Sequence, residues 1–143
     1  MFEPTRDQAR DFFFETWRKY RAGEPLGGLE AIVLDVILAH PEYHPALDDP
    51  ERFRERDYAP ELGEPNPFLH LSMHLAIEEQ LSIDQPIGVV GSFAALTAKR
   101  GDRHEAMHEA MECLGEMVWR AQRDRAPPDA AAYLECLKKR ARH

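Results

Sequence analysis

Residues 66–86 have the sequence NPFLHLSMHLAIEEQLSIDQP and carry the clearest helix pattern of the chain. Asn66 is a good N-cap residue and Pro67 suits the first helical position, so a helix is predicted from Pro67 to about Ser82. Successive residues of a helix turn by about 100°, and three polar side chains then share one side. They are Ser72, Glu79 and Gln80. The opposite, buried side is centred on His74, so polar groups are predicted in the middle of the apolar face.

The remaining segments also favour helices. Capping signals, apolar residues at 3.6-residue spacing, and glycine or proline stops favour helical structure at six other places, of which the segment from Pro50 is short and charged and the segment from Pro86 contains two glycines that lower helix propensity. These segments run from Thr5 to about Arg21, Leu29 to Ala39, Pro50 to about Arg56, Pro86 to Lys99, Asp102 to about Arg123, and from Pro127 onward. No segment alternates convincingly as a strand. We predict an all-α, single-domain helical bundle of about five to six helices over residues 1–143, with short loops such as residues 59–65.

The composition limits the kinds of partner. The chain has 143 residues, 43% of them hydrophobic, and its 18 basic and 26 acidic residues give a net charge of −8. This charge repels nucleic-acid phosphate and anionic lipid, so neither nucleic acid nor membrane is an expected partner. The apolar run from Ala31 to Ala39 is too short to span a bilayer. Cys113 and Cys136 form no Cys-x-x-Cys motif, and we predict packing residues without a disulfide framework, in a soluble cytoplasmic protein.

Histidine spacing is the strongest chemical signal. Six of the seven histidines form three pairs four residues apart. The pairs are His40 and His44, His70 and His74, and His104 and His108. Random placement of seven histidines would give about 0.3 such pairs. Residues four apart lie on the same face of a helix, so each pair can present two nitrogen ligands side by side.

Two of these pairs continue with a glutamate four residues on, at Glu78 and Glu112. Imidazole and carboxylate groups that converge from neighbouring helices form metal sites in helical bundles. The best candidate ligands are His70, His74, Glu78, His108 and Glu112, followed by His40, His44 and His104. We predict a divalent metal site for Zn, Fe, Mn or Ni. Eight candidates exceed the four ligands of one zinc ion, so the pattern is compatible with a binuclear site.

The three pairs are not equivalent. Pro41 and Pro45 follow His40 and His44 directly and bias both histidines away from helical geometry, so this pair is expected at a helix end or in a loop. His104 belongs to the first turn of its helix, where an imidazole is often solvated. The pair at His70 and His74 is therefore the central one.

Other interpretations of the same residues stay open. Buried histidines and glutamates can form a hydrogen-bond network that fixes helix register in a non-enzymatic interaction or scaffold protein. Histidines can also make a bundle respond to pH. The sequence lacks the His-Glu-x-x-His, Gly-x-Ser-x-Gly and phosphate-loop motifs. It therefore does not establish an enzyme; a metal-dependent hydrolase or an oxygen-reactive metalloenzyme is the class to expect if there is one. A small-molecule or protein partner and a homo-oligomer are equally open.

Several segments resemble one known family. They are FFFETWRKYRAGEPL (12–26), HPEYH (40–44), NPFLHLSMHLAIEEQLSIDQP (66–86) and ECLGE (112–116). Together they are similar to the bacterial family called domain of unknown function 1841, over nearly the whole chain. The resemblance implies a cytoplasmic bacterial protein and brings no activity with it. His74, Glu78, His104 and His108 are also similar to part of the hemerythrin pattern, which is an analogy of architecture only.

Overall fold

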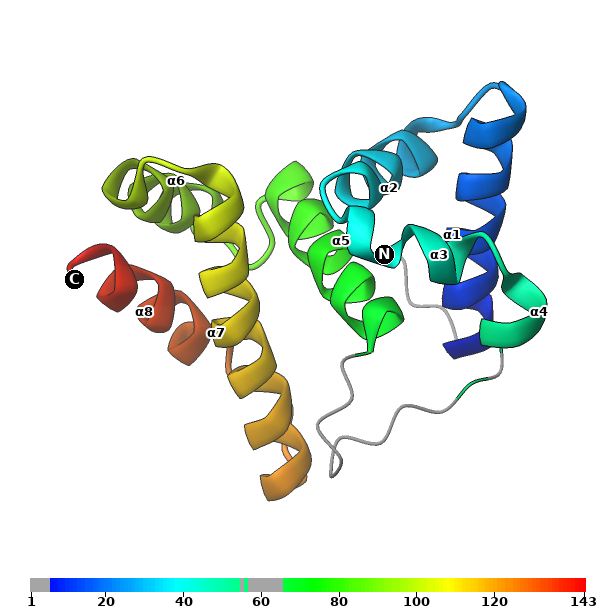
Figure 1. The fold of residues 1–143 in the computed structure, drawn as a ribbon. Helices are drawn as coiled ribbons and strands as arrows, with labels where there is room; N and C mark the ends of the chain where they lie inside the picture. Colours follow the sequence, from blue (N-terminus) through cyan, green and yellow to red (C-terminus); the bar gives the residue numbers. More distant parts are fainter. Residues whose placement is uncertain (1–5, 55, 57–65) are drawn as a thin grey trace. The chain divides into compact units, whose positions relative to one another are not determined.

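The chain folds into helices in the computed structural model, which describes residues 6–54, 56 and 66–143 (Figure 1). Its elements are α1 (Arg6–Ala22), α2 (Gly28–Leu38), the 3₁₀ helix η1 (Pro41–Tyr43), α3 (His44–Leu47), α4 (Pro50–Phe53), α5 (Pro67–Ile83), α6 (Val89–Arg100), α7 (Arg103–Asp124) and α8 (Ala130–Ala141). The described residues contain no β-strand. The predicted all-α class is confirmed.

The number of helices is higher than predicted. Eight α-helices occur in the described part of the chain, where five to six were expected. The short charged helix predicted at Pro50 is present as α4, which begins at Pro50 and ends at Phe53. The helix without a predicted counterpart is α3, which has four residues and carries a proline in its first turn. Four residues are too few to display a 3.6-residue apolar period, so such a turn leaves little trace in the sequence. The predicted start of α1 at Thr5 and the predicted loop 59–65 lie outside the described residues.

Cap residues explain which predicted boundaries hold. Asn66 accepts hydrogen bonds from the backbone N–H groups of Phe68 and Leu69 at distances of 3.0 and 3.1 Å, and Asp102 caps α7 in the same way. Both predicted starts are therefore confirmed. The predicted starts of the helices at Pro86 and Pro127 are wrong. Gly88 precedes α6 with φ +100°, and α8 begins only after Asp129, whose carboxylate accepts from the backbone N–H of Ala132.

The chain divides into two compact units, Met1–Leu75 and Ala76–His143, and the boundary falls within α5. The single domain expected from the chain length stays a prediction.

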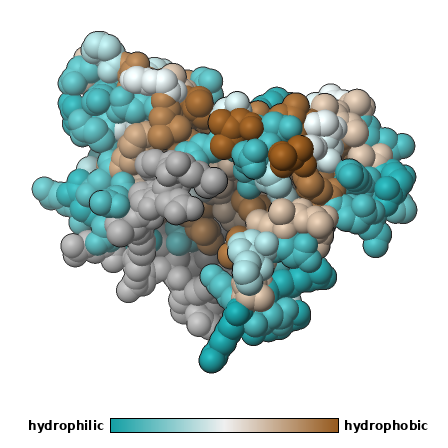
Figure 2. Space-filling model, turned by 180° about the vertical axis from the view of Figure 1, so that it is seen from behind, coloured by the Kyte–Doolittle hydropathy of each residue, from teal (hydrophilic) through white to brown (hydrophobic). Residues whose placement is uncertain are grey.

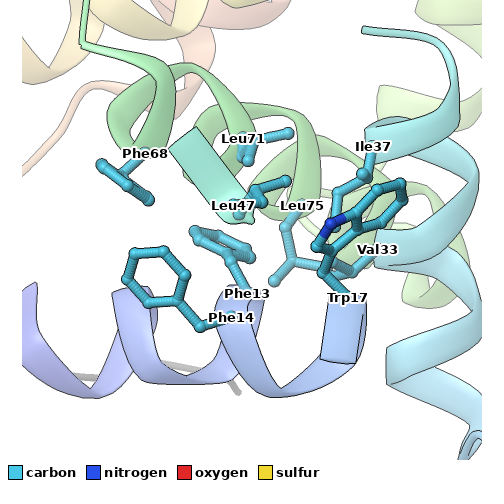
Figure 3. Close-up of a cluster of buried hydrophobic side chains, with 9 residues drawn as sticks. All are labelled: Phe13, Phe14, Trp17, Val33, Ile37, Leu47, Phe68, Leu71 and Leu75. Atoms are coloured by element: carbon cyan, nitrogen blue, oxygen red, sulfur yellow. The ribbon is translucent and has the colours of Figure 1, made fainter. Parts of the chain in front are cut away.

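An aromatic and aliphatic core holds unit 1 together. Phe13, Phe14 and Trp17 project from α1 toward the part of α5 that belongs to this unit, as Figure 3 shows. The other members are Val33, Ile37, Leu47, Phe68, Leu71 and Leu75. All nine are at most 4% exposed, so each contributes the roughly 1.5–3 kcal/mol expected for a buried large apolar side chain. This core holds the C-terminal end of α2, which precedes His40, and the N-terminal half of α5, which carries His70 and His74.

Helices α6, α7 and α8 pack against one another in unit 2 (Figure 1). Leu96, Met107 and Leu137, one from each helix, are at most 2% exposed. The buried hydroxyl of Tyr133 donates a 2.7 Å hydrogen bond to Gln80 Oε1. Its burial raises the pKa of Tyr133 to about 12, because the phenolate would lose its hydration there.

A disulfide joins Cys113 of α7 to Cys136 of α8, with their Cα atoms 5.9 Å apart. The prediction of two unlinked packing cysteines was therefore wrong. The two residues are 23 positions apart in the sequence and belong to different helices, so only the packing of α7 against α8 brings their sulfur atoms into bonding range.

The surface combines charged residues with single apolar side chains. Figure 2 shows hydrophobic side chains in brown among hydrophilic ones on the face that it draws. Large exposed apolar residues include Leu69, Ile83, Ile87 and Trp119, the first at 57% and Ile87 at 78% exposure. They lie on α5 and α7 and in the turn before α6, and scattered apolar residues of this kind are usual for protein surfaces. Within the described ranges, no helix has both the length and the apolar character that a membrane span requires.

Candidate metal centre

Three histidines of unit 1 converge at one point. His70 and His74 are one turn apart on α5, so their side chains leave the same face of the helix. His40 comes from a different part of the chain, directly after α2 and before η1. Its backbone N–H donates a 3.0 Å hydrogen bond to the carbonyl of Ile37, which places it at the end of α2. The proline after His40 ends the helix as predicted, and the resulting turn aims the imidazole at α5.

The Nε2 atoms of these histidines point at one another. His70 Nε2 lies 3.0 Å from His40 Nε2 and 3.2 Å from His74 Nε2. The candidate ligand nitrogens of all three lie within 4.8 Å of one another. His40 and His74 are 5% and 3% exposed, and His70 is half-buried. Three imidazole nitrogens therefore share a small, largely dry volume, as the predicted burial of His74 required.

A backbone carbonyl determines the tautomer of His40. His40 Nδ1 lies 2.8 Å from the carbonyl oxygen of Val36, which can only accept a hydrogen bond. Nδ1 must therefore carry the proton, and the Nε2 atom of neutral His40 presents a lone pair to His70. Metal-binding histidines commonly use this arrangement, in which a carbonyl accepts from one ring nitrogen and orients the other toward the ion.

Hydrogen bonds among three neutral imidazole rings account poorly for this arrangement of nitrogen atoms. If His70 Nε2 carries a proton and donates it to His40, it has no in-plane lone pair left to accept from His74. If it carries a lone pair instead, it faces the lone pair of His40 at 3.0 Å. In the first case the N–H of His70 can be donated fully to only one of the two neighbouring rings, and in the second two lone pairs face each other. A cation at the point of convergence would accept all three lone pairs at once.

The nitrogen separations match those around a divalent metal ion. With Zn–N bonds of about 2.0–2.1 Å, adjacent nitrogens lie about 3.4 Å apart in a tetrahedron and about 3.0 Å apart in an octahedron. The observed separations of 3.0 and 3.2 Å fall at this scale. The nitrogen atoms of His40, His70 and His74 thus lie at separations compatible with metal coordination.

Tyr43 forms a wall of this site. Its ring stacks on that of His40 with centroids 5.3 Å apart and an interplanar angle of 4°, and it meets the edge of His70 at 5.7 Å. Partial burial, followed by the nearby carboxylate of Glu42, raises the pKa of Tyr43. The phenol is therefore protonated at neutral pH and can donate a hydrogen bond. Histidine spacing does not point to Tyr43, although this residue lies between His40 and His44 in the sequence.

His44, the partner of His40 in the spacing pattern, makes different contacts. Its Nε2 lies 2.9 Å from the carbonyl oxygen of Ile37, and its ring packs on Trp17 at a centroid distance of 4.4 Å. This nitrogen therefore donates to the C-terminal end of α2, where carbonyl groups lack helical partners. The structure assigns His44 contacts that support the turn, and its role as a ligand stays a prediction.

The remaining predicted ligands belong to unit 2. Glu78 forms an ion pair with Arg103 at 2.8 Å. Glu112, whose side chain is 65% exposed, forms one with Arg140 at 2.6 Å. These two carboxylates are thus engaged by guanidinium groups, a partnership that helix spacing alone does not reveal.

His104 and His108 form an edge-to-face pair on α7, with ring centroids 4.2 Å apart. His104 is exposed, as its place in the first helical turn indicated, and His108 is half-buried. The predicted i, i+4 geometry of this pair is present in unit 2. Its part in metal binding stays a prediction.

The sequence matches one family, described as Domain of unknown function (DUF1841), over residues 5–139. Because this match covers nearly the whole chain, the protein belongs to that family. No curated protein and no solved structure matches the chain.

Proposed function

We propose that this protein binds a divalent transition-metal ion through His40, His70 and His74. The observation that carries the proposal is the convergence of three imidazole nitrogens at separations of 3.0 and 3.2 Å. The carbonyl of Val36 supports it, because this acceptor turns the lone pair of His40 toward the other two rings.

Three imidazoles favour some metals over others. Nitrogen ligands suit Zn, Fe and Ni, whereas Mn and Mg prefer carboxylate and water oxygen atoms. The three imidazoles of unit 1 therefore favour Zn, Fe and Ni over Mn. Neutral histidines leave the charge of a divalent ion uncompensated, so an anion or a polarised water molecule is a natural fourth ligand.

A metal ion held by three histidines would have a fourth coordination position open to water or substrate. Catalytic zinc sites typically have three protein ligands and one water molecule, whose pKa the metal lowers to about 7. Oxygen-activating non-haem iron centres instead use two histidines and one carboxylate. A metal-dependent hydrolase is therefore the enzyme class that three imidazoles favour. The phenol of Tyr43, next to His40 and His70, is the side chain that would donate a hydrogen bond to a group bound there.

The predicted ligands of unit 2 complete the proposal. We include His108 as the first candidate for a further ligand, because it is half-buried on the helix face that the sequence predicts to point inward. Glu78, Glu112 and His104 follow it, since the two carboxylates already pair with arginines and His104 is exposed. This ranking favours one metal ion per chain over two.

The proposed partners follow from the same properties. A net charge of −8 supports a small-molecule or protein partner over nucleic acid or an anionic membrane. A cytoplasmic location is part of the proposal as well. Metal binding itself requires no second copy of the chain.

A structural histidine network is the alternative, and one observation favours it. The nitrogen separations of 3.0 and 3.2 Å are also within hydrogen-bonding range. Such a network would hold the end of α2 against α5 without any ion. It predicts that a chelator leaves the unfolding midpoint unchanged, whereas a bound metal predicts a lower midpoint.

Elemental analysis separates the two functions. Untagged protein, purified without chelator, is expected to contain about one Zn, Fe or Ni per chain. The metal should disappear in His40→Ala, His70→Ala and His74→Ala, while His143→Ala, which removes an exposed terminal histidine, serves as the matched control. Circular dichroism of each variant verifies the helical fold. A content below about 0.1 metal per chain, in protein also dialysed against each metal, would contradict the proposal.

The same preparation tests the ligand set. Co²⁺ added to apoprotein is expected to produce visible absorption bands of a nitrogen-coordinated ion, which the three histidine variants should lose. His108→Ala and His104→Ala should then change the bands only if unit 2 contributes a ligand. Unaltered bands in His74→Ala would remove His74 from the proposed site.

A further inference from the structure

The disulfide of unit 2 faces a pocket. Cys113 and Cys136 both line a cavity of about 410 Å³ between the C-terminal half of α7 and the beginning of α8. Ala132, one turn before Cys136 on the same face of α8, lines it as well. The disulfide thus borders a preformed cavity, and Cys136, one of its two residues, is only half-buried.

The two sulfur-bearing residues differ in exposure. Cys113 is 2% exposed, whereas Cys136 is half-buried. Thiol–disulfide exchange requires the attacking thiolate to reach one sulfur in line with the bond that breaks. Cys136 is therefore the residue that an incoming thiol meets first, and Cys113 is placed to leave.

We propose that Cys113–Cys136 is a redox-active disulfide that exchanges with small-molecule thiols entering this pocket. The thiolate of the incoming molecule forms a bond to Sγ of Cys136. The bond between the protein sulfurs breaks, and its electron pair leaves with Sγ of Cys113, which takes up a proton. A second thiol attacks the mixed disulfide and releases Cys136, so two thiols are oxidised to one disulfide while the protein gains two thiols.

Reduction leaves α8 attached to its neighbours. Leu137 is 0% exposed, and Tyr133 donates its hydrogen bond to Gln80 on α5. Arg100 of α6 also donates a 3.1 Å hydrogen bond to the carbonyl of Arg140. These contacts do not involve sulfur, so the dithiol form keeps the helix in place and can be reoxidised. In reducing compartments, disulfides are typically of this transient, redox-sensing kind.

The pocket places no strong charge requirement on the thiol. Arg120 and Arg123 line it, but each forms an ion pair with a neighbouring acid, at 2.7 Å and 2.8 Å respectively. Access, more than charge, is therefore expected to select the substrate. Small thiols such as reduced glutathione and 2-mercaptoethanol are suitable probes.

The test is native-state exchange followed by peptide mass spectrometry. The full-length oxidised protein is incubated with reduced glutathione at neutral pH without denaturant, quenched with acid and mapped. We expect the mixed disulfide on Cys136, at least tenfold in excess over Cys113. Glutathione found mainly on Cys113, or exchange that occurs only after denaturant is added, would overturn the proposal.

Two alanines of α8 provide a matched pair of variants. Ala132→Leu adds a branched side chain inside the pocket, whereas Ala131→Leu adds the same side chain at an exposed position outside its lining. The first is expected to slow the reaction with glutathione at least fivefold, and the second to leave the rate within twofold. Equal rates in both variants would overturn the proposed route, and circular dichroism verifies that each retains its helices.

Single-cysteine variants provide an independent measurement. Cys113→Ala leaves only the thiol of Cys136, and Cys136→Ala leaves only that of Cys113. Reaction with a chromogenic aromatic disulfide is expected to be at least tenfold faster for the Cys136 thiol. A faster reaction at Cys113 would contradict the assignment of Cys136 as the sulfur that is attacked.

Discussion

Replacing His74 by leucine tests the proposed metal site through stability. His74 is 3% exposed, and its Nε2 lies 3.2 Å from that of His70. Leucine removes the lone pair while filling a similar volume. Burial of the leucine side chain adds roughly 1.5–3 kcal/mol to the free energy of unfolding. This gain offsets the loss of roughly 0.5–1.5 kcal/mol from the hydrogen bond that His74 could make. Metal-free His74→Leu should therefore be about as stable as the metal-free parent.

The two proteins should differ once metal is present. A ligand that binds only the folded state at 100 times its Kd adds about 2.7 kcal/mol to the free energy of unfolding. For a chain of this length, that corresponds to a Tm increase of about 8 °C. The parent should gain this increment, and His74→Leu should gain almost none, because two imidazoles bind a divalent ion far more weakly than three.

Urea unfolding followed by circular dichroism measures both increments. Each protein is compared in EDTA and in excess Zn²⁺, and His143→Leu is the control for nonspecific binding to surface histidines. The reasoning fails if the parent gains nothing from Zn²⁺, Fe²⁺ or Ni²⁺, or if His74→Leu gains as much as the parent. The first result would favour the hydrogen-bond network, and the second would remove His74 from the proposed ligands.

Three further predictions concern unit 2. Under oxidising conditions, Cys136→Ser should lower the free energy of unfolding by about 3 kcal/mol, because the disulfide joins residues 23 positions apart and restricts the unfolded chain. An unchanged urea midpoint would contradict this. Arg100 lowers the pKa of Glu109, so this glutamate stabilises the fold above its ordinary pKa and the contribution is lost as the pH falls. Glu109→Gln should flatten the acid limb of the stability profile, and an equally steep limb would refute the pairing. The pKa of Tyr133 is raised to about 12. The neutral phenol therefore stabilises the fold fully below pH 10, and about 3 kcal/mol of folding free energy is lost as the pH rises toward 12. Tyr133→Phe should lose less stability across this interval in urea titrations, and a loss equal to the parent's would exclude Tyr133 as the cause.

The helices and their caps could be predicted because local residues determine them. Asn66 and Asp102 satisfy N–H groups two and three residues away, so their effect is visible in a few letters of sequence. The short helix α3 was not predicted, because its turn depends on a proline and on contacts with α1 and α4 more than on periodic apolar residues.

The candidate site was predicted in part. The spacing of His70 and His74 determines that they share a helix face, and the predicted burial of His74 is confirmed. His40 was ranked lower, since the following proline made its direction uncertain. Its actual direction depends on the turn after α2 and on the Val36 carbonyl, which accepts from its ring.

Local spacing is enough to predict that the chain is helical, where α5 and α7 begin, and which histidines share a face, because these properties depend on residues within one turn of each other. Helix packing is needed to bring His40 to His70 and His74, to turn His44 to the end of α2, and to bond Cys113 to Cys136. These contacts join residues that are distant in sequence or lie in different turns. Their geometry depends on how helices pack around a core, and local spacing carries no information about that packing.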